Sequence, residues 1–225
     1  MIKSIRNEKE KKTCVISVAG FCDCTIPYYI AKTLAGMGCE TLAIDNSKYT
    51  DMFYALSGGV ETEVAEADLV IGLKNIEFSP EPFSRFDYVV VWHGCSIDKE
   101  LWEYSDLRIL SPDYNEAHNV YLAKELEDVS HDMHIVFWNK VSSRVAEKDV
   151  LKRLGVKDND VYVEIGQQVI EADGTDMGNA VNLSKNGTQA LKHFSVQFKE
   201  VIAEAVRYFY KNEAKTIKVC IAKAR

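Results

Sequence analysis

Short apolar runs alternate along this chain with longer amphipathic stretches, and this alternation restricts the possible folds more than any other feature. The runs are rich in β-branched residues and lack strict apolar/polar alternation, so both faces of each predicted strand should be covered. We predict strands over Cys14–Ala19, Glu40–Asp45, Phe86–Trp92, Leu107–Leu110, Met133–Trp138 and Val161–Ile165. Helical patterns occupy Pro27–Met37, Asn115–Glu127, Ala146–Leu154 and His193–Tyr210. This order predicts an α/β fold, a doubly wound, mostly parallel sheet with helices on both faces.

The apolar positions of the helical stretches indicate which sides pack on the sheet. In the middle helix they are Val120, Leu122, Ala123 and Leu126, and in the last helix Phe194, Phe198, Val201, Ile202, Ala205 and Phe209. Further along, Ile217, Val219 and Ile221 alternate with other residues, which predicts a strand in the C-terminal tail. The tail is basic, and peripheral membrane contact through it is an alternative that we do not favour.

Length and charge limit the organisation and the partners. The chain has 225 residues and no linker rich in Pro, Gly or Ser, so we expect a single domain over residues 1–225. The net charge of -7 argues against generic binding of nucleic acid through a basic surface. The sequence shows neither an apolar signal core nor a segment long enough to span a bilayer, so we expect a cytoplasmic protein. Its six cysteines should then be reduced thiols.

The predicted architecture also indicates where function should lie. Parallel α/β sheets bind ligands outside the carboxyl ends of their strands. The functional residues are therefore expected in the loops that follow Ala19, Asp45, Trp92, Leu110 and Trp138.

The first two predicted strands and the segment between them read CVISVAGFCDCTIPYYIAKTLAGMGCETLAID. This segment resembles the opening of the MinD/ParA group of P-loop ATPases (SIMIBI class), in which a strand, a Gly-rich phosphate loop, a helix and a strand ending in aspartate follow one another. The family order continues in TDMFYALSGGVETEVAEADLVIGL, RFDYVVVWHG, SDLRILSPDYNEAHNVYLAKELED and MHIVFWNKV. The resemblance covers nearly the whole chain and implies a P-loop NTPase-like fold.

The resemblance implies a nucleotide site after the first strand. The matching phosphate-loop positions are Gly20, Phe21, Cys22, Asp23, Cys24 and Thr25. Thr25 matches the hydroxyl that binds magnesium, Asp45 matches the family's magnesium-linked catalytic aspartate, and Asn139 matches the asparagine that contacts adenine. The implied ligand is ATP or ADP with Mg²⁺ held through Thr25 and Asp45.

Several positions depart from the family pattern. Cys24 stands where the main phosphate-binding lysine would be, Asp23 adds a negative charge beside it, and Ala19 replaces the second lysine. Trp92 replaces the aspartate of the switch region. Because each charge-assisted hydrogen bond contributes about 1.5–3 kcal/mol, these losses should suppress hydrolysis more than binding. The resemblance therefore implies a pseudo-ATPase in which nucleotide is bound weakly or as a structural ligand.

For such a degenerate member the resemblance implies localisation or assembly of a cellular machine, such as the pilus or secretion systems that TadZ/CpaE-like proteins place at the cell pole. We expect a homodimer with protein partners. One alternative is an active ATPase with an atypical loop and a lysine from elsewhere, such as Lys32 or a partner subunit. Another is a small-molecule enzyme that uses His93 and Cys95 at the strand ends as a nucleophilic pair.

The remaining candidates have simpler interpretations. Cys22 and Cys24 form a C-x-C pair, but a metal site needs more ligands, and a small residue tolerated in a degenerate loop explains Cys24 better than a reactive thiol does. Asp45 and Asn139 also suit ordinary turns at strand ends. The histidines His131 and His134 are expected in a loop before a strand.

Overall fold

The computed structural model describes residues 13–49, 52, 64–66, 69–73, 83–130, 132–140, 145–157, 167–172, 174–186 and 189–224. The predicted strand 161–165 and His131 lie outside the described residues.

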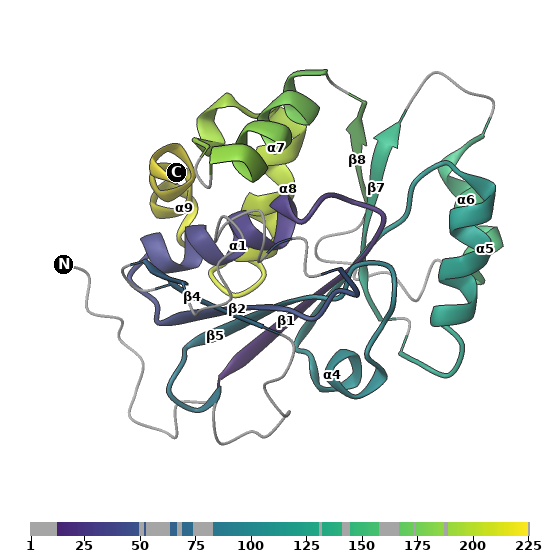
Figure 1. The fold of residues 1–225 in the computed structure, drawn as a ribbon, viewed down its shortest axis with the longest axis horizontal. Helices are drawn as coiled ribbons and strands as arrows, with labels where there is room; N and C mark the ends of the chain where they lie inside the picture. The colour runs from purple at the N-terminus through teal and green to yellow at the C-terminus, as the bar shows by residue number, and fades with distance from the viewer. Residues whose placement is uncertain are drawn as a thin grey trace.

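One sheet runs through the centre of the described structure (Figure 1). Its strands lie in the order β3-β4-β2-β5-β1-β6-β7-β8. All neighbours from β4 to β8 are parallel, and β3 is antiparallel to β4. In chain order the strands are β1 (Cys14–Gly20), β2 (Thr41–Asp45), β3 (Val64–Glu66), β4 (Leu69–Leu73), β5 (Tyr88–Trp92), β6 (Leu107–Ser111), β7 (His134–Lys140) and β8 (Gln167–Glu171). The predicted, mostly parallel sheet is confirmed.

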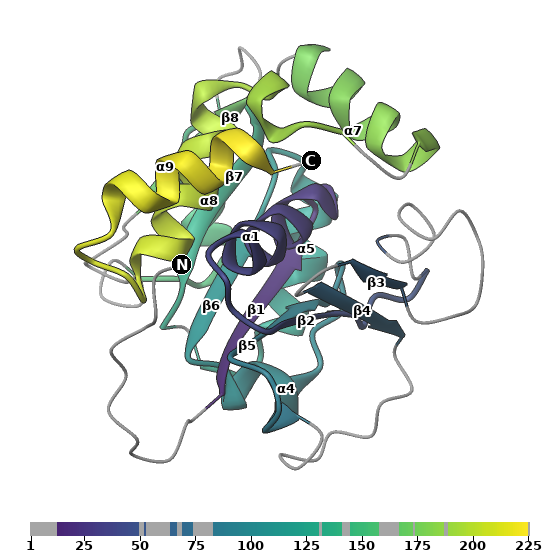
Figure 2. The ribbon, with the colours of Figure 1, turned by 90° about the vertical axis from the view of Figure 1, so that its left-hand side faces the viewer.

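Helices cover both faces of this sheet (Figures 1 and 2). One face carries α1 (Thr25–Gly36), α7 (Gly174–Asn186), α8 (Val196–Arg207) and α9 (Ala214–Lys223). The other face carries α4 (Lys99–Tyr104), α5 (Glu116–Glu125) and α6 (Glu147–Leu154). The doubly wound arrangement expected from the uninterrupted apolar strands is thus confirmed, because such strands need cover on both sides.

The central strand β1 shows how the two faces are built. Its Ile16 and Val18 side chains enter the core shared with α1 and α8. The neighbouring Val15 and Ala19 enter cores on the opposite face. Successive side chains of a strand point to opposite faces, so a strand buried on both sides must be apolar at nearly every position. Ser17 is the exception in β1, and it is hydrogen-bonded within the interior.

The C-terminal tail is a helix, so the predicted strand there is wrong. Helix α9 buries Ile217, Cys220 and Ile221, whereas Val219 is 50 % exposed. Residues 217 and 221 are four positions apart and share one face of a helix, so the apparent alternation came from two core residues and one surface residue.

The middle and last helices also differ in detail from the prediction. Val120 is exposed on α5, because Leu122 and Leu126 define the buried side and residue 120 points away from it. The predicted helix His193–Tyr210 divides into a short 3-10 turn, η2 (Leu191–His193), and α8. The division falls at Ser195, whose hydroxyl accepts the Phe198 N–H at 3.1 Å and caps α8.

His134 is buried in β7 rather than placed in a loop, and its Nε2 lies 2.9 Å from Oε1 of Gln168 on β8. Among the helices of the described residues, none combines the length and apolar character that a membrane crossing requires.

Candidate functional site

A cavity of about 530 Å³ opens at the carboxyl ends of the central strands. Three of the five loops expected to carry function contribute to it, namely those after β1, β2 and β5, and helix α5, which follows β6, supplies the remaining side. The lining residues are Gly20, Phe21, Cys22, Ser47, Lys48, Tyr49, Trp92, Gly94, Cys95, Ser96, Ala117, His118 and Tyr121. Of the predicted nucleotide-site residues, Gly20, Phe21 and Cys22 line this cavity.

The loop after β1 begins with two backbone contacts to neighbouring strands. The Gly20 N–H donates to the Gly94 carbonyl oxygen at 2.7 Å, and the Phe21 N–H donates to the Ser111 carbonyl oxygen at 2.8 Å. Gly20 has a φ of +131°, and a Cβ atom there would lie 2.1 Å from the Ser111 oxygen. Glycine is therefore required for this approach, and both N–H groups are already bonded within the protein.

The carboxylate of Asp23 occupies the N-terminus of α1. Its Oδ1 accepts the Thr25 N–H at 2.9 Å, and the Asp23 carbonyl accepts the Ile26 N–H at 3.3 Å. A helix N-terminus is the part of a phosphate loop that attracts anions, because its N–H groups and dipole favour negative charge. Here the protein supplies that negative charge from its own side chain.

Cys24 and Thr25 are both buried beside this carboxylate. Cys24 is 8 % exposed and its Sγ lies 3.5 Å from Oδ1 of Asp23. Such burial does not present a reactive thiol to solvent. The Thr25 side chain is fully buried, and its hydroxyl has no hydrogen-bond partner among the described residues. A buried hydroxyl of this kind suits a metal ligand, so Thr25 remains compatible with magnesium.

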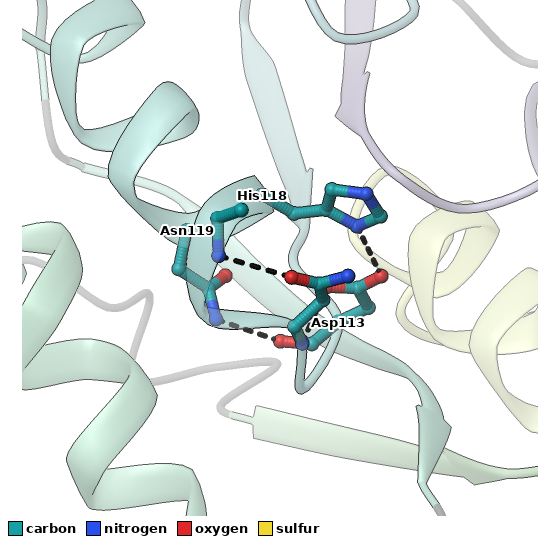
Figure 3. A network of polar contacts seen from close by, with 5 residues as sticks. Asp113, His118 and Asn119 are labelled. Carbon is teal, nitrogen blue, oxygen red and sulfur yellow. Dashed lines mark hydrogen bonds and ion pairs between the residues drawn. The ribbon is translucent and has the colours of Figure 1, made fainter.

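The Phe21 side chain packs the loop after β1 against α5. Its ring stacks on the His118 imidazole, with a centroid distance of 4.0 Å and an interplanar angle of 7°. Figure 3 shows the polar contacts of His118 and Asn119 with Asp113. Nδ1 of His118 lies 2.6 Å from Oδ2 of Asp113, and the Asn119 amide donates to the Asp113 carbonyl at 3.0 Å. Asp113 thus fixes the orientation of the imidazole that forms one wall of the cavity.

Asp45 is directed into a local turn. It is fully buried, and its Oδ1 accepts the Ser47 N–H at 3.0 Å and the Ser47 hydroxyl at 2.6 Å. On the adjacent strand Trp92 is in register with Asp45 and is 2 % exposed. The aspartate expected to help hold magnesium is therefore engaged in capping its own turn, and an indole stands beside it.

Asn139 lies near the end of β7, where the pairing with β8 shifts register between Phe137 and Lys140. Its φ of 54° is in the left-handed region, which asparagine tolerates better than most residues. This backbone conformation accounts for an asparagine at the position, and Asn139 is not among the cavity-lining residues that the structure describes.

His93 belongs to a buried polar chain instead of to an exposed nucleophilic pair. Its Nδ1 accepts the Asp98 N–H at 3.2 Å, so Nε2 carries the proton and donates to the Ser17 hydroxyl at 2.9 Å. The Ser17 and Ser105 hydroxyls lie 2.7 Å apart, and Ser105 donates to the Leu101 carbonyl at 2.8 Å. Desolvation lowers the pKa of His93 to about 4, while the nearby Asp98 acts in the opposite direction. The imidazole is therefore neutral at pH 7.

The arrangement as a whole does not fit a magnesium triphosphate held in the family manner. The N–H groups of Gly20, Phe21 and Thr25 are bonded internally, and the lysine position is a buried cysteine. Among the described residues, no group of three or more His, Cys, Asp or Glu side chains is placed to bind a metal ion. Thr25 keeps the one feature that suits magnesium, and Asp23 supplies a charge that repels phosphate.

Sequence reasoning missed the residues that complete the cavity, namely Ser47, Lys48, Tyr49, Ser96, Ala117, His118 and Tyr121. The signal that could have found some of them was present, because all lie within the strand-end loops or the first two turns of α5. The sequence did not indicate which of those side chains turn inward.

Comparison with known proteins supports the same fold. Neither a family model nor a curated protein matches the sequence. Among solved structures, MinD in the MinC:MinD cell division complex of Aquifex aeolicus superposes with a TM-score of 0.58 at 13% identity, covering 88% of this chain and 96% of that one. A ParA family ATPase from Chlorobium tepidum gives 0.57 at 16% identity, with 84% and 97% covered.

A third neighbour is a putative plasmid partition protein of Borrelia burgdorferi bound to AMPPNP, with a TM-score of 0.53, 15% identity, and 89% and 100% of the chains covered. The structural neighbours are thus ATPases of the MinD/ParA family. At these identities the likeness establishes the fold, and the chain has the α/β architecture of MinD/ParA-type P-loop NTPases.

Proposed function

We propose that this protein is a degenerate MinD/ParA-like pseudo-ATPase that acts in localisation or assembly of a cellular machine, such as a pilus or secretion system. In this role it resembles the TadZ/CpaE-like proteins. The observation that carries the proposal is the Asp23 carboxylate at the N-terminus of α1, where it accepts the Thr25 N–H. Nucleotide binding is weak or structural.

The residues at this site should support weak nucleotide binding better than they support nucleotide hydrolysis. Each absent charge-assisted hydrogen bond costs about 1.5–3 kcal/mol of ligand or transition-state stabilisation. The buried Cys24 supplies no such bond, and Asp23 adds repulsion. Hydrolysis needs stabilisation of the charge that develops in the transition state, so it is lost before binding is.

The proposed partners are inferred from the same likeness to MinD/ParA proteins. The neighbour MinD is seen in complex with MinC, and we propose that this chain likewise acts through protein partners, as a homodimer in the cytoplasm. Light scattering after gel filtration, with and without ATP and Mg²⁺, tests the dimer. A fluorescent fusion in the native cell tests the positioning role, for which a discrete focus is expected and a uniform signal would count against it.

The two alternatives are less well supported by geometry. Lys32 is the eighth residue of α1, which places its Cα about 10 Å along the helix axis from Thr25. An active site using Lys32 would therefore need a long reach back to the loop. In the small-molecule enzyme, His93 would act on Cys95, yet both its ring nitrogens are hydrogen-bonded in the interior.

Calorimetric titration with ATP and ADP, each with and without Mg²⁺, tests the proposal together with phosphate release on the same sample. The wild type should bind weakly and release no phosphate. The double variant Asp23→Gly/Cys24→Lys should bind ATP at least about tenfold more tightly, because it removes a repulsive charge and restores the lysine. Asp132→Lys, at an exposed position outside the site, changes the net charge equally and is the matched control.

Turnover would contradict the proposal. Magnesium-dependent phosphate release by the wild type, abolished by Asp45→Ala, would instead identify an active ATPase with an atypical loop.

A further inference from the structure

Five of the thirteen residues that line the cavity carry aromatic rings. Phe21 and His118 form one wall as a stacked pair, and the buried Trp92 lies at the end of β5. Tyr49 and Tyr121 are the other two aromatic lining residues and are 73 % and 43 % exposed, respectively. Rings on several sides of a cavity of this size suit a flat aromatic ligand, since stacked and edge-to-face contacts both become available.

The charge of the lining is positive. Among the cavity-lining residues that the structure describes, Lys48 carries a permanent charge and no carboxylate is present. The Lys48 ammonium lies 5.4 Å from the centroid of the Tyr49 ring, so a cation and an aromatic surface adjoin.

We propose that this cavity binds a small planar aromatic molecule that carries a single carboxylate. The ring would lie among Trp92, Tyr121 and the Phe21–His118 pair, and the carboxylate would contact Lys48. A triphosphate is a poor occupant, because the backbone N–H groups that would wrap it are bonded internally and one exposed lysine faces several negative charges. This ligand site is a property additional to the proposed positioning role, and it does not depend on that role.

Calorimetric titration with 2-naphthoate tests the site directly. We expect binding with a Kd below about 1 mM, and binding at least about tenfold weaker for two analogues. One is 2-naphthamide, which keeps the rings and lacks the charge, and the other is cyclohexanecarboxylate, which keeps the charge and lacks an aromatic ring. Because MgATP binds weakly, adding it first should leave the Kd of naphthoate nearly unchanged.

Variants at the cavity separate this site from adsorption elsewhere. Tyr121→Ala and Lys48→Met should each weaken naphthoate binding about tenfold or more, because one removes a ring and the other the charge. Tyr104→Ala is the control for the first, since Tyr104 is 42 % exposed and lies outside the lining. Lys152→Met, at an exposed position on α6, is the control for the second.

Several outcomes would overturn the proposal. They are an absence of naphthoate binding at millimolar concentration, equal binding of the amide or the saturated acid, and equal losses in the control variants. The ATP titrations give their result separately, so a failure of this site and a failure of the pseudo-ATPase proposal are distinguishable.

Discussion

Two loops at the same edge of the sheet are held in place in different ways. The loop between β1 and α1 is held by backbone hydrogen bonds from Gly20 and Phe21 and by the Asp23 carboxylate at its far end. The loop between β5 and α4 is held by the His93 side chain, which reaches the interior and binds Ser17. The two loops meet where Gly20 donates to the Gly94 carbonyl.

Because the two loops are held differently, they should be sensitive to different changes. A backbone contact tolerates many side chains but no extra Cβ atom at the point of closest approach. A buried imidazole tolerates changes of shape poorly and also responds to pH, because protonation would place a charge in a desolvated site. Near β1 the first loop therefore depends on one glycine, whereas the second loop depends on a buried imidazole.

The largest expected effect is that of Gly20→Ala. The new Cβ atom would meet the Ser111 oxygen at 2.1 Å in a backbone conformation that alanine rarely adopts. We expect the free energy of unfolding to fall by about 4 kcal/mol or more, as measured by urea denaturation.

Gly38→Ala is the matched control, since Gly38 also has a positive φ, +86°, but no atom lies within 4 Å of the Cβ position. It should cost only about 1–3 kcal/mol, from backbone strain alone. Equal losses in the two variants would show that the approach to Ser111 is not what requires glycine.

A smaller effect is expected from titration of His93. Its pKa is about 4 in the folded protein and close to the ordinary 6.5 in the unfolded chain. Between these values the unfolded state binds the additional proton, so stability is unaffected above pH 7 and falls as the pH decreases through this window. The gap corresponds to about 3 kcal/mol at pH 4.

Urea denaturation at a series of pH values measures this contribution. His93→Gln should be less stable at pH 7 yet lose less stability between pH 7 and pH 4 than the wild type does. His193→Gln, at an exposed position in η2, is the control and should retain the wild-type dependence. An unchanged slope in His93→Gln would show that other groups cause the acid sensitivity.

The smallest expected effect is the coupling between Phe21 and His118. A double-mutant cycle with Phe21→Ala and His118→Ala should give about 0.5–1.5 kcal/mol of interaction free energy from the stacked rings. Phe21→Ala combined with Tyr104→Ala should be additive within about 0.5 kcal/mol. A coupling near zero would mean that the loop between β1 and α1 is positioned without the imidazole.

The sequence predicted the central strands because each is apolar at nearly every position, and it located the loops that line the cavity because parallel strands share one carboxyl edge. It failed at the tail, where Ile217 and Ile221 are four residues apart and also fit an alternating pattern. It also left His93 open as a nucleophile, since its hydrogen bonds to Ser17 and the Asp98 N–H come from separate parts of the chain.

By itself, the sequence determined the α/β architecture and the chemical character of the first loop, with a cysteine and an aspartate where phosphate chemistry needs a lysine and a small residue. The tertiary structure decided what those residues contact. Asp23 accepts the Thr25 N–H, and Phe21 stacks on His118. The physical reason is that hydrophobic periodicity specifies which elements form, whereas side-chain contacts at a strand end depend on the register and close approach of segments distant in sequence.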